Sequence, residues 1–569
     1  MNKPFKFLIV GILLSIIFVS IGFSADSSMA QVNADKWGVW TLIPPLVAII
    51  LAFITKNVLL SLFTGVFSGV YILLIEKHNI FSSFIFGFLK VTQEILEAIS
   101  SPWNAGIILQ TLTIGGLIAL ISKMGGAKAI AKSLSKKAKS PTSAQIYTWL
   151  LGIVVFFDDY ANALTVGPIM RPITDKMRIS REKLSFIIDS TAAPIAGIAL
   201  ISTWIGYELG LIKDGFHIIG QDVNAYGVFV STIPFRFYNI FILIFIFFSA
   251  ILLREFGPMR RAELRTRRTG KVHSATAELM SDLESQGIQP KENIKLRIVN
   301  AVLPISTLII VAFLGLYYNG YQTIMAGDNI GLINKINDIP LSMFSLRHCF
   351  SNSNAAIVLF QAALFSSILA AVMGRLQKIF SIKEAIEIWV KGVKSLIITI
   401  LILALAWTLS SIVKELGTAR YLVNILSGRI PPFLLSSIIF ILGATISFAT
   451  GTSYGTMGIL MPLTIPLAYA ISPDPLFLSI NIGAVLTGAI FGDHCSPISD
   501  TTIISSMGAS CDHIDHVRTQ LFYAIPVAII AILFGYIPVS LGVPVWLSLF
   551  IGSSVIFLLI FFIGKKVDK

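Results

Sequence analysis

The sequence predicts an all-α, multi-pass membrane protein built from two repeats of inverted topology. Of its 569 residues, 55% are hydrophobic and only 13% are charged, whereas soluble domains carry about 25% charged residues. This composition excludes a soluble enzyme and a disordered chain. Stretches long enough to cross a bilayer as helices lie near residues 38–55, 57–75, 104–122, 225–253, 298–318, 350–373, 395–413, 519–540 and 546–563.

The N-terminal segment, residues 1–30, is predicted to be a signal peptide or an uncleaved first transmembrane helix. Lys3 and Lys6 precede a nearly continuous apolar run, and Ser28 and Ala30 place small residues where a signal peptidase cuts. In both cases the residues that follow lie outside the cell.

Basic residues assign the loops to the two sides of the membrane. Segment 123–139 has six Lys and no acidic residue, 171–183 has five Lys or Arg, and 462–475 has none. Because cytoplasmic loops are rich in Lys and Arg, the first two segments lie inside. The apolar stretch between them must therefore enter and leave on one side, which predicts a re-entrant hairpin at 142–170. The same reasoning predicts a second hairpin at 432–461, entering from outside.

The two hairpins also resemble each other in sequence. Residues 157–170 align without gaps with 448–461, with Phe, Gly and Met coinciding, and Pro194 downstream matches Pro497. Equivalent loops carry opposite charge bias, as expected of inverted repeats. The formal net charge of +13 follows from the cytoplasmic loops, so no nucleic-acid partner is expected.

This alignment divides the chain into two membrane repeats and a linker. The N-terminal repeat covers 31–253 and the C-terminal repeat covers 298–569. Between them, 254–297 has ten basic and six acidic residues and is expected to be a mobile cytoplasmic linker. Each repeat also contains an apolar stretch interrupted by Pro and polar residues, predicted to be a broken helix, at 184–212 and 476–507.

Polar interruptions of the apolar stretches are the candidate ion sites. Non-helical backbone and ionisable side chains are costly inside a bilayer and usually mark an ion or proton path. Carboxylate, amide and hydroxyl oxygens suit Na⁺, and a carboxylate can exchange a cation for a proton. The candidate ion- and proton-binding residues are Asp158, Asp159 and Asn162 in the first hairpin, Asp189, Ser190 and Thr191 in the first broken helix, and Asp493, His494, Ser496, Asp500 and Thr501 in the second.

The second hairpin carries hydroxyl groups and glycines instead of charges. Hydroxyls at a helix start suit an ion or a substrate carboxylate. The candidate substrate-binding residues are Thr450, Thr452, Ser453 and Thr456. The alternative is that these small residues serve close helix packing.

The other segments also have structural alternatives. One Asp of the first hairpin could face the cytoplasmic mouth as a solvated charge, and Pro194 could simply kink its helix. His513 and His516 would share one face of a helix and could bind a metal with His494 or Cys495. The alternative is that both belong to a solvated helix start with acidic residues near its N-terminus.

Three motifs resemble those of the NhaC-type Na⁺/H⁺ antiporter family. They are FFDDYAN at 156–162, ATGTSYGTMGILMPL at 449–463 and GDHCSPISDTTIISS at 492–506. The resemblance implies a secondary transporter of the wider ion-transporter superfamily, with two inverted repeats that each contain a re-entrant hairpin and a broken helix. It also implies exchange of external H⁺ for internal Na⁺. Relatives of this family include antiporters of malate and lactate.

We therefore predict a secondary antiporter of the cell membrane, not an enzyme, in which intramembrane carboxylates bind Na⁺ and H⁺ alternately. The expected partners are the lipid bilayer, Na⁺ and H⁺, with a small carboxylate and a homodimer as further options, and no cofactor is expected. The first alternative is an ion-coupled antiporter of a small organic acid or an amino acid. A membrane metalloenzyme is the second, but the sequence has no His-Glu-x-x-His motif.

Overall fold

The computed structural model is almost entirely helical. It describes residues 29–55, 57–75, 79–135, 138–200, 202–275, 277, 290, 294–418, 420, 421, 425, 431–497 and 499–567. Within these residues, nine helices are long and apolar enough to cross a membrane, or up to 11 if each of two bent helix pairs is one span. The predicted all-α, multi-pass class is confirmed. Most of the segment predicted as signal peptide or first helix lies outside the described residues.

Most of the long helices follow the predicted apolar stretches. The first half contains α2 (Met29–Trp37), η1 (Gly38–Leu42), α3 (Ile43–Thr55), α4 (Val58–Leu74), α5 (Ile80–Ser100), α6 (Pro102–Lys123), α7 (Gly126–Ser135), α8 (Pro141–Val154), α9 (Asp159–Lys176), α10 (Arg181–Thr191), α11 (Ala193–Ala196), α12 (Ile205–Ile218), α13 (Ala225–Thr232), η2 (Ile233–Phe235) and α14 (Phe237–Leu252). Next come β1 (Arg254–Glu255) and α15 (Gly257–Thr269). The second half contains α16 (Val299–Met325), α17 (Ile330–Asp338), α18 (Met343–Ser351), α19 (Ala355–Leu376), α20 (Ile382–Ser395), α21 (Ile397–Leu416), α23 (Pro432–Thr450), α24 (Ser453–Ile471), α25 (Pro475–Cys495), α26 (Asp500–Ala509), α27 (His513–Ile530), η3 (Ala531–Tyr536), α28 (Ile537–Ser540), α29 (Val545–Phe562) and β2 (Lys565–Lys566).

Helix α5 is missing from the predicted spans. Lys90, Glu94 and Glu97 interrupt its apolar run, whereas Phe81 and Leu96 are exposed on its surface. Lys90 pairs with Glu415 of α21 at 3.3 Å. The helix is therefore amphipathic, with its charges turned toward α21, and an apolar window does not detect it.

Both predicted hairpins form helix–turn–helix pairs. Helices α8 and α9 are joined at residues 155–158, and α23 and α24 are joined at Gly451 and Thr452, where Gly451 has a φ of +69°. Both hairpins are longer than predicted because the second arm continues through two prolines, to Lys176 in α9 and to Ile471 in α24. Neighbouring helices make such prolines tolerable within a membrane.

The two predicted broken helices are interrupted where the sequence places Pro and polar residues. Helix α10 ends at Thr191, and Ala192 has non-helical backbone angles (φ −85°, ψ −93°). The short α11 follows, and α12 begins only at Ile205. In the second half, α25 ends at Cys495 and α26 begins at Asp500.

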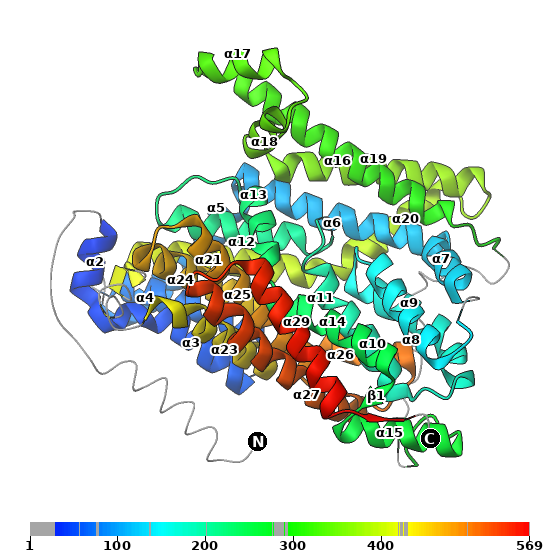
Figure 1. Cartoon of the computed structure of the whole chain (residues 1–569). Coiled ribbons are helices and arrows are strands. Elements are labelled where there is room, and N and C mark those ends of the chain that lie inside the picture. Colours follow the sequence, from blue (N-terminus) through cyan, green and yellow to red (C-terminus); the bar gives the residue numbers. More distant parts are fainter. Residues whose placement is uncertain are drawn as a thin grey trace.

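The halves interlock through their hairpins (Figure 1). Helices α8 and α9 pack on α10, just as α23 and α24 pack on α25. The second arm of each hairpin also packs on the broken helix of the other half, α9 on α26 and α24 on α12. This reciprocal packing relates the two halves and brings both helix breaks into one region.

Substitution of Gly508 by Ala is expected to destabilise this packing. A Cβ at Gly508 would lie 2.5 Å from the carbonyl oxygen of Ala163, and one at Gly167 would lie 2.5 Å from the backbone of Gly508. Overpacking of this kind costs about 1–3 kcal/mol, so the apparent melting temperature in detergent should fall. Gly87→Ala is the matched control, because its Cβ would make only an ordinary 3.4 Å contact with Phe67. Equal melting temperatures for both variants would contradict the close crossing of α9 and α26.

The first part of the predicted linker 254–297 is structured instead of mobile. Strand β1 pairs with the C-terminal β2, and α15 packs on α10 and α27. Glu263 of α15 accepts the backbone N–H of Ser180 at 2.7 Å, and Arg265 pairs with Glu182 at 2.9 Å. Burial, and then the nearby Glu255 carboxylate, raise the pKa of Glu263 above its ordinary value. These contacts attach the segment to the N-terminal end of α10.

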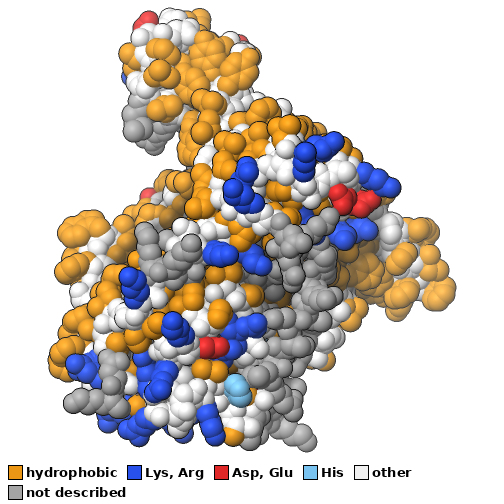
Figure 2. Space-filling view, turned by 90° about the vertical axis from the view of Figure 1, so that its right-hand side faces the viewer, with side chains coloured by type: hydrophobic (Ala, Val, Ile, Leu, Met, Phe, Trp, Pro, Cys, Tyr) orange, Lys and Arg blue, Asp and Glu red, His pale blue; other side chains and the backbone are white. Residues whose placement is uncertain are grey.

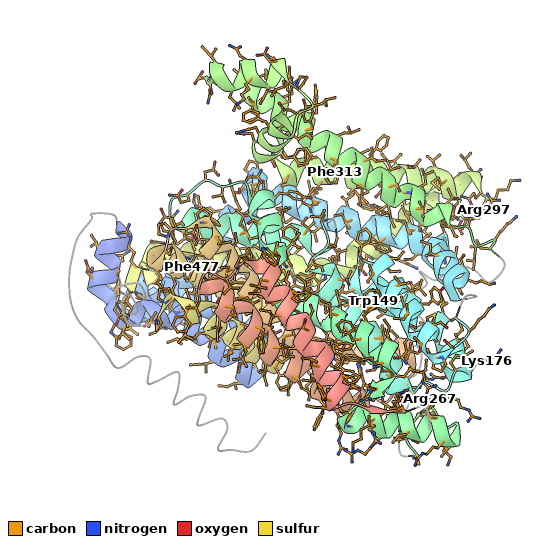
Figure 3. The ribbon with its side chains drawn as sticks, in the orientation of Figure 1. Trp149, Lys176, Arg267, Arg297, Phe313 and Phe477 are labelled. Carbon is orange, nitrogen blue, oxygen red and sulfur yellow. The ribbon has the colours of Figure 1, made fainter. Side chains whose placement is uncertain are left out.

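Basic residues gather at one end of the molecule. Figure 3 shows Lys176, Arg267 and Arg297 at this end and Phe477 of α25 toward the opposite end. Viewed face-on in Figure 2, this end carries Lys and Arg side chains with few acidic ones. The positive-inside rule predicts that this basic end faces the cytoplasm.

Candidate functional site

Each hairpin makes polar contacts with the broken helix of its own half, close to the point where that helix is interrupted. In the first half, Asn162 Nδ2 donates to the carbonyl oxygens of Thr191 and Gly152, both at 2.8 Å. In the second half, Ser453 Oγ donates to Asp493 Oδ2 at 2.8 Å. Asn162 and Ser453 are equivalent in the alignment of the two hairpins. The two halves therefore build matching contacts from different polar groups.

The two helix ends are joined to each other by a histidine. Ser190 Oγ lies 3.0 Å from His494 Nε2, and Tyr238 OH of α14 lies 2.7 Å from His494 Nδ1. His494 is fully buried. An unbroken series of contacts thus leads from the first hairpin through α10 and α25 to the second hairpin. The structure brings the predicted residues of both halves together.

Asp189 lies beside this junction and is completely buried. Ser505 Oγ of α26 donates to Asp189 Oδ1 at 3.2 Å, and Gln520 Nε2 of α27 donates to Oδ2 at 2.7 Å. His516 Nε2 and His494 Nε2 lie 3.7 and 4.0 Å from the same Oδ2. A carboxylate at this depth needs compensation by hydrogen bonds and by a proton or cation.

The tips of both hairpins meet the segment that starts α12. Thr203 Oγ1 donates to Asp158 Oδ2 at 3.1 Å, and its N–H donates to the Phe157 carbonyl at 3.0 Å. One residue further, the Trp204 ring packs on Tyr454 of the second hairpin with centroids 4.8 Å apart. Asp159 is 6% exposed, whereas Asp158 is only half-buried. The adjacent carboxylates therefore occupy different environments.

The hydroxyls of the second hairpin point mostly to its own backbone. Thr450 and Thr456 donate to the carbonyls of Ile446 and Thr452, both at 2.9 Å. Thr452 caps α24 by accepting the N–H of Gly455. Of the four predicted substrate-binding residues, Ser453 is the one that bonds to a carboxylate here.

The remaining predicted residues support the break in the second broken helix. Ser496 Oγ donates to the Phe448 carbonyl at 2.8 Å, which ties the break to the second hairpin. Thr501 Oγ1 lies 2.8 Å from the Oγ of Ser499, which is the N-cap of α26. Asp500 is the first residue of α26, but its side chain lies outside the described part of the structure.

Comparison with known proteins identifies the family of the chain. A model described as the Na⁺/H⁺ antiporter family matches residues 195–539. The chain belongs to this family. The protein is therefore a secondary antiporter and an integral membrane transporter, not an enzyme, and the resemblance to NhaC-type antiporters is confirmed.

The relatives of this antiporter align with different fractions of its chain. A Haemophilus influenzae protein described as uncharacterized is 35% identical over 531 residues, covering 93% of this chain and 96% of its own. The Na⁺/H⁺ antiporter NhaC of Alkalihalophilus pseudofirmus is 30% identical over 29% of this chain and 35% of its own. The malate-2H⁺/Na⁺-lactate antiporter of Bacillus subtilis is 32% identical over 32% and 38%. Among solved structures, MtrF of Neisseria gonorrhoeae has a TM-score of 0.52 and 11% identity over 80% of this chain and 85% of its own, a likeness of fold alone.

Four polar residues of the candidate site were not predicted from the sequence. They are Thr203, Tyr238, Ser505 and Gln520. Tyr238 lies between Arg236 and Asn239 in the apolar stretch 225–253, and Gln520 follows Thr519 at the start of the stretch 519–540. A search for hydrogen-bonding residues inside predicted spans would have included both, because such groups need a buried partner.

A fully buried ion pair lies next to the candidate site. Arg236 Nη2 lies 2.9 Å from Glu208 Oε2, and both side chains are 0% exposed. Arg236 Nη1 also donates to the carbonyl of Gly197 at 2.6 Å, at the end of α11. The pair therefore holds the non-helical segment between α11 and α12, which carries Thr203, against α14.

Proposed function

We propose that this antiporter exchanges Na⁺ for H⁺, with Asp189 carrying the proton. The observation that supports this is the presence of two buried carboxylates, Asp189 and Asp493, at the ends of the two broken helices. A buried carboxylate is strongly destabilised unless a cation or a proton compensates it. In this proposal the proton binds Asp189 and the cation binds at Asp493, and the two positive charges disfavour each other across one buried site, which couples the two ions.

The Na⁺ site of this proposal lies where both hairpins meet the broken helices. Asp493 and Ser453 supply oxygens from the second half, and Asp159 and Asn162 supply them from the first. The Oδ1 atom of Asn162 is buried and accepts no hydrogen bond among the described residues. Carboxylate, hydroxyl and amide oxygens are the ligands that hard cations prefer.

An organic acid is the second candidate substrate. The Bacillus subtilis malate-2H⁺/Na⁺-lactate antiporter favours it, as does the hydroxyl-rich second hairpin. The charges next to the site argue for Na⁺: the nearby Arg236 is paired with Glu208, and Lys183 is paired with Glu255 at 2.9 Å. Neither cation is available to bind a substrate carboxylate without breaking a buried pair.

A Na⁺ pulse outside proteoliposomes that enclose a pH dye is expected to drive proton efflux without any organic substrate. In Asp493→Asn and Asp159→Asn, loss of a charged oxygen ligand should raise the Na⁺ concentration for half-maximal flux by about 10–100-fold. Asp474→Asn is the matched control, because Asp474 is the exposed N-cap of α25. Proton efflux that requires malate, lactate or an amino acid would instead establish the organic substrate. Wild-type Na⁺ dependence in both site variants would reject the Na⁺ site.

A further inference from the structure

A chain of hydrogen-bonding groups leads from Asp189 toward the basic end of the molecule. His516 Nε2 lies 3.7 Å from Asp189 Oδ2 and 2.8 Å from Gln520 Oε1. On the other side of the ring, His516 Nδ1 lies 2.8 Å from Ser506 Oγ, which lies 3.1 Å from His513 Nδ1. His516 is fully buried, whereas His513 is half-buried at the start of α27. The chain of groups therefore connects a buried carboxylate to the protein surface.

The outer contacts of this chain fix one hydrogen on each ring. His513 Nε2 lies 2.8 Å from the Pro497 carbonyl, which can only accept, so this nitrogen carries a hydrogen. Gln520 Nε2 faces Asp189 Oδ2 and the His494 carbonyl, so the amide oxygen of Gln520 must face His516. His516 Nε2 therefore also carries a hydrogen.

The contacts of Ser506 with the Nδ1 atoms of His513 and His516 require one more proton than two neutral rings and one hydroxyl supply. If both imidazoles are neutral, both Nδ1 atoms are acceptors, and the single hydroxyl hydrogen of Ser506 can reach only one of them. The Thr502 carbonyl, 2.8 Å from Ser506 Oγ, competes for the same hydrogen. Both contacts between Ser506 and the two rings form together only when one ring is doubly protonated. The Asp189 carboxylate is the nearby charge that compensates such a cation.

We propose that His513, Ser506 and His516 form a proton relay between the basic end and Asp189; this rests on the proposed function. The N–H bond at His513 Nδ1 breaks as its proton passes to Ser506 Oγ, and the hydroxyl hydrogen of Ser506 passes to His516 Nδ1. His516 then releases its Nε2 hydrogen, and an O–H bond forms at Asp189. One proton has moved, and Ser506 and His516 have each gained and lost one. The 3.7 Å gap closes when His516 turns from Gln520 toward the carboxylate.

Three helices place charged and titratable groups beside the relay. Helix α10 contributes Asp189 and, toward the surface, Arg181, which bonds to the carbonyl of Ala509 at 2.6 Å. Helix α25 contributes His494. On α27 itself, Asp512 accepts the N–H of Asp515 at 2.9 Å, and Asp515 accepts a hydrogen bond from Ser274 at 2.8 Å. The Asp189 carboxylate favours a proton on the relay, whereas Arg181 and the burial of His516 oppose it.

Transport measurements on Ser506→Ala test the relay. We expect Na⁺-driven proton flux to fall about tenfold or more, whereas exchange of labelled Na⁺ for Na⁺, which moves no proton, stays at the wild-type rate. Ser506→Thr keeps the hydroxyl and should restore proton flux. Ser185→Ala is the matched control, because it removes a buried hydroxyl with no hydrogen-bond partner among the described residues. Normal proton flux in Ser506→Ala, or an equal loss of both exchange modes, would overturn the relay.

Histidine-selective ¹⁵N spectra test the relay without any transport assay. As the pH is lowered, His513 and His516 of the wild type should take up one proton between them, with both rings responding together. In Ser506→Ala the two rings should respond independently. Independent titration in the wild type would overturn the relay, even if Na⁺ drives proton flux. A wild type without Na⁺-driven flux would reject the proposed function, while these spectra would still decide whether the rings share a proton.

Discussion

Replacement of Asp189 by Asn is expected to reduce Na⁺-driven proton flux by about 100-fold or more without unfolding the protein. The variant amide has the shape of the carboxylate, and its oxygen can accept the N–H of Gln520 while its NH₂ faces Ser505 Oγ. The hydrogen bonds of Asp189 are thus retained, but the group that takes up the proton is lost. The measurement is the rate of dye-reported proton efflux after a Na⁺ pulse, normalised to the amount of reconstituted protein.

Two further results make the Asp189 experiment decisive. Labelled Na⁺ exchange should persist in Asp189→Asn, because the proposed Na⁺ oxygens of Asp493 and Ser453 remain. The exposed Asp222→Asn, which alters a surface pair with Lys213, serves as the charge-matched control. Proton flux within a factor of about two of wild type would mean that another group carries the proton.

Replacement of Arg236 by Met is expected to cause the largest loss of stability. It leaves Glu208 buried without its partner and removes the donor to the Gly197 carbonyl. Breaking a buried pair in this way costs about 3–5 kcal/mol. The apparent melting temperature of the purified protein should therefore fall by about 5 °C or more.

The double variant Arg236→Met, Glu208→Gln separates charge from packing. Because it buries no unpaired charge, it should recover more than half of the lost melting temperature. Glu208→Gln alone keeps an acceptor for Arg236 and should be milder than Arg236→Met. If the double variant were as unstable as Arg236→Met, the loss would come from packing and from the Gly197 contact instead of an unpaired carboxylate.

Much of the fold follows from local sequence, since bilayer thickness, apolar run length and loop charge act over short segments. Apolar run length and loop charge together predict both hairpins, and Pro and polar residues within apolar stretches predict both helix breaks. The same signals fail for α5, where Lys90 and Glu94 interrupt the apolar run, and for the distal ends of α9 and α24, where prolines stand inside helices. In these places tertiary packing overrides the local pattern.

The candidate site is less predictable because its hydrogen bonds join distant parts of the chain. The sequence indicates Asp189 and His494 as polar interruptions, but it does not show that Gln520 reaches one and Tyr238 the other. It also offers two interpretations for His516, a metal ligand or part of a solvated helix start. The structure places His516 in a buried network with Ser506 instead. Within the described residues, no three His, Cys, Asp or Glu side chains form a group that could bind a metal.

Because the two halves of this antiporter interlock, helices of the first half are synthesised well before the helices they pack against. Helix α9 is complete at Lys176, but its partner α26 begins at Asp500. At about 5–20 residues per second, the ribosome needs roughly 16–65 s to synthesise the chain between them. During that interval the glycine-containing face of α9 has no native neighbour and must be covered by lipid, by the insertion machinery or by a provisional helix. Native assembly of the first half is therefore a late event, completed only after the second half has entered the bilayer.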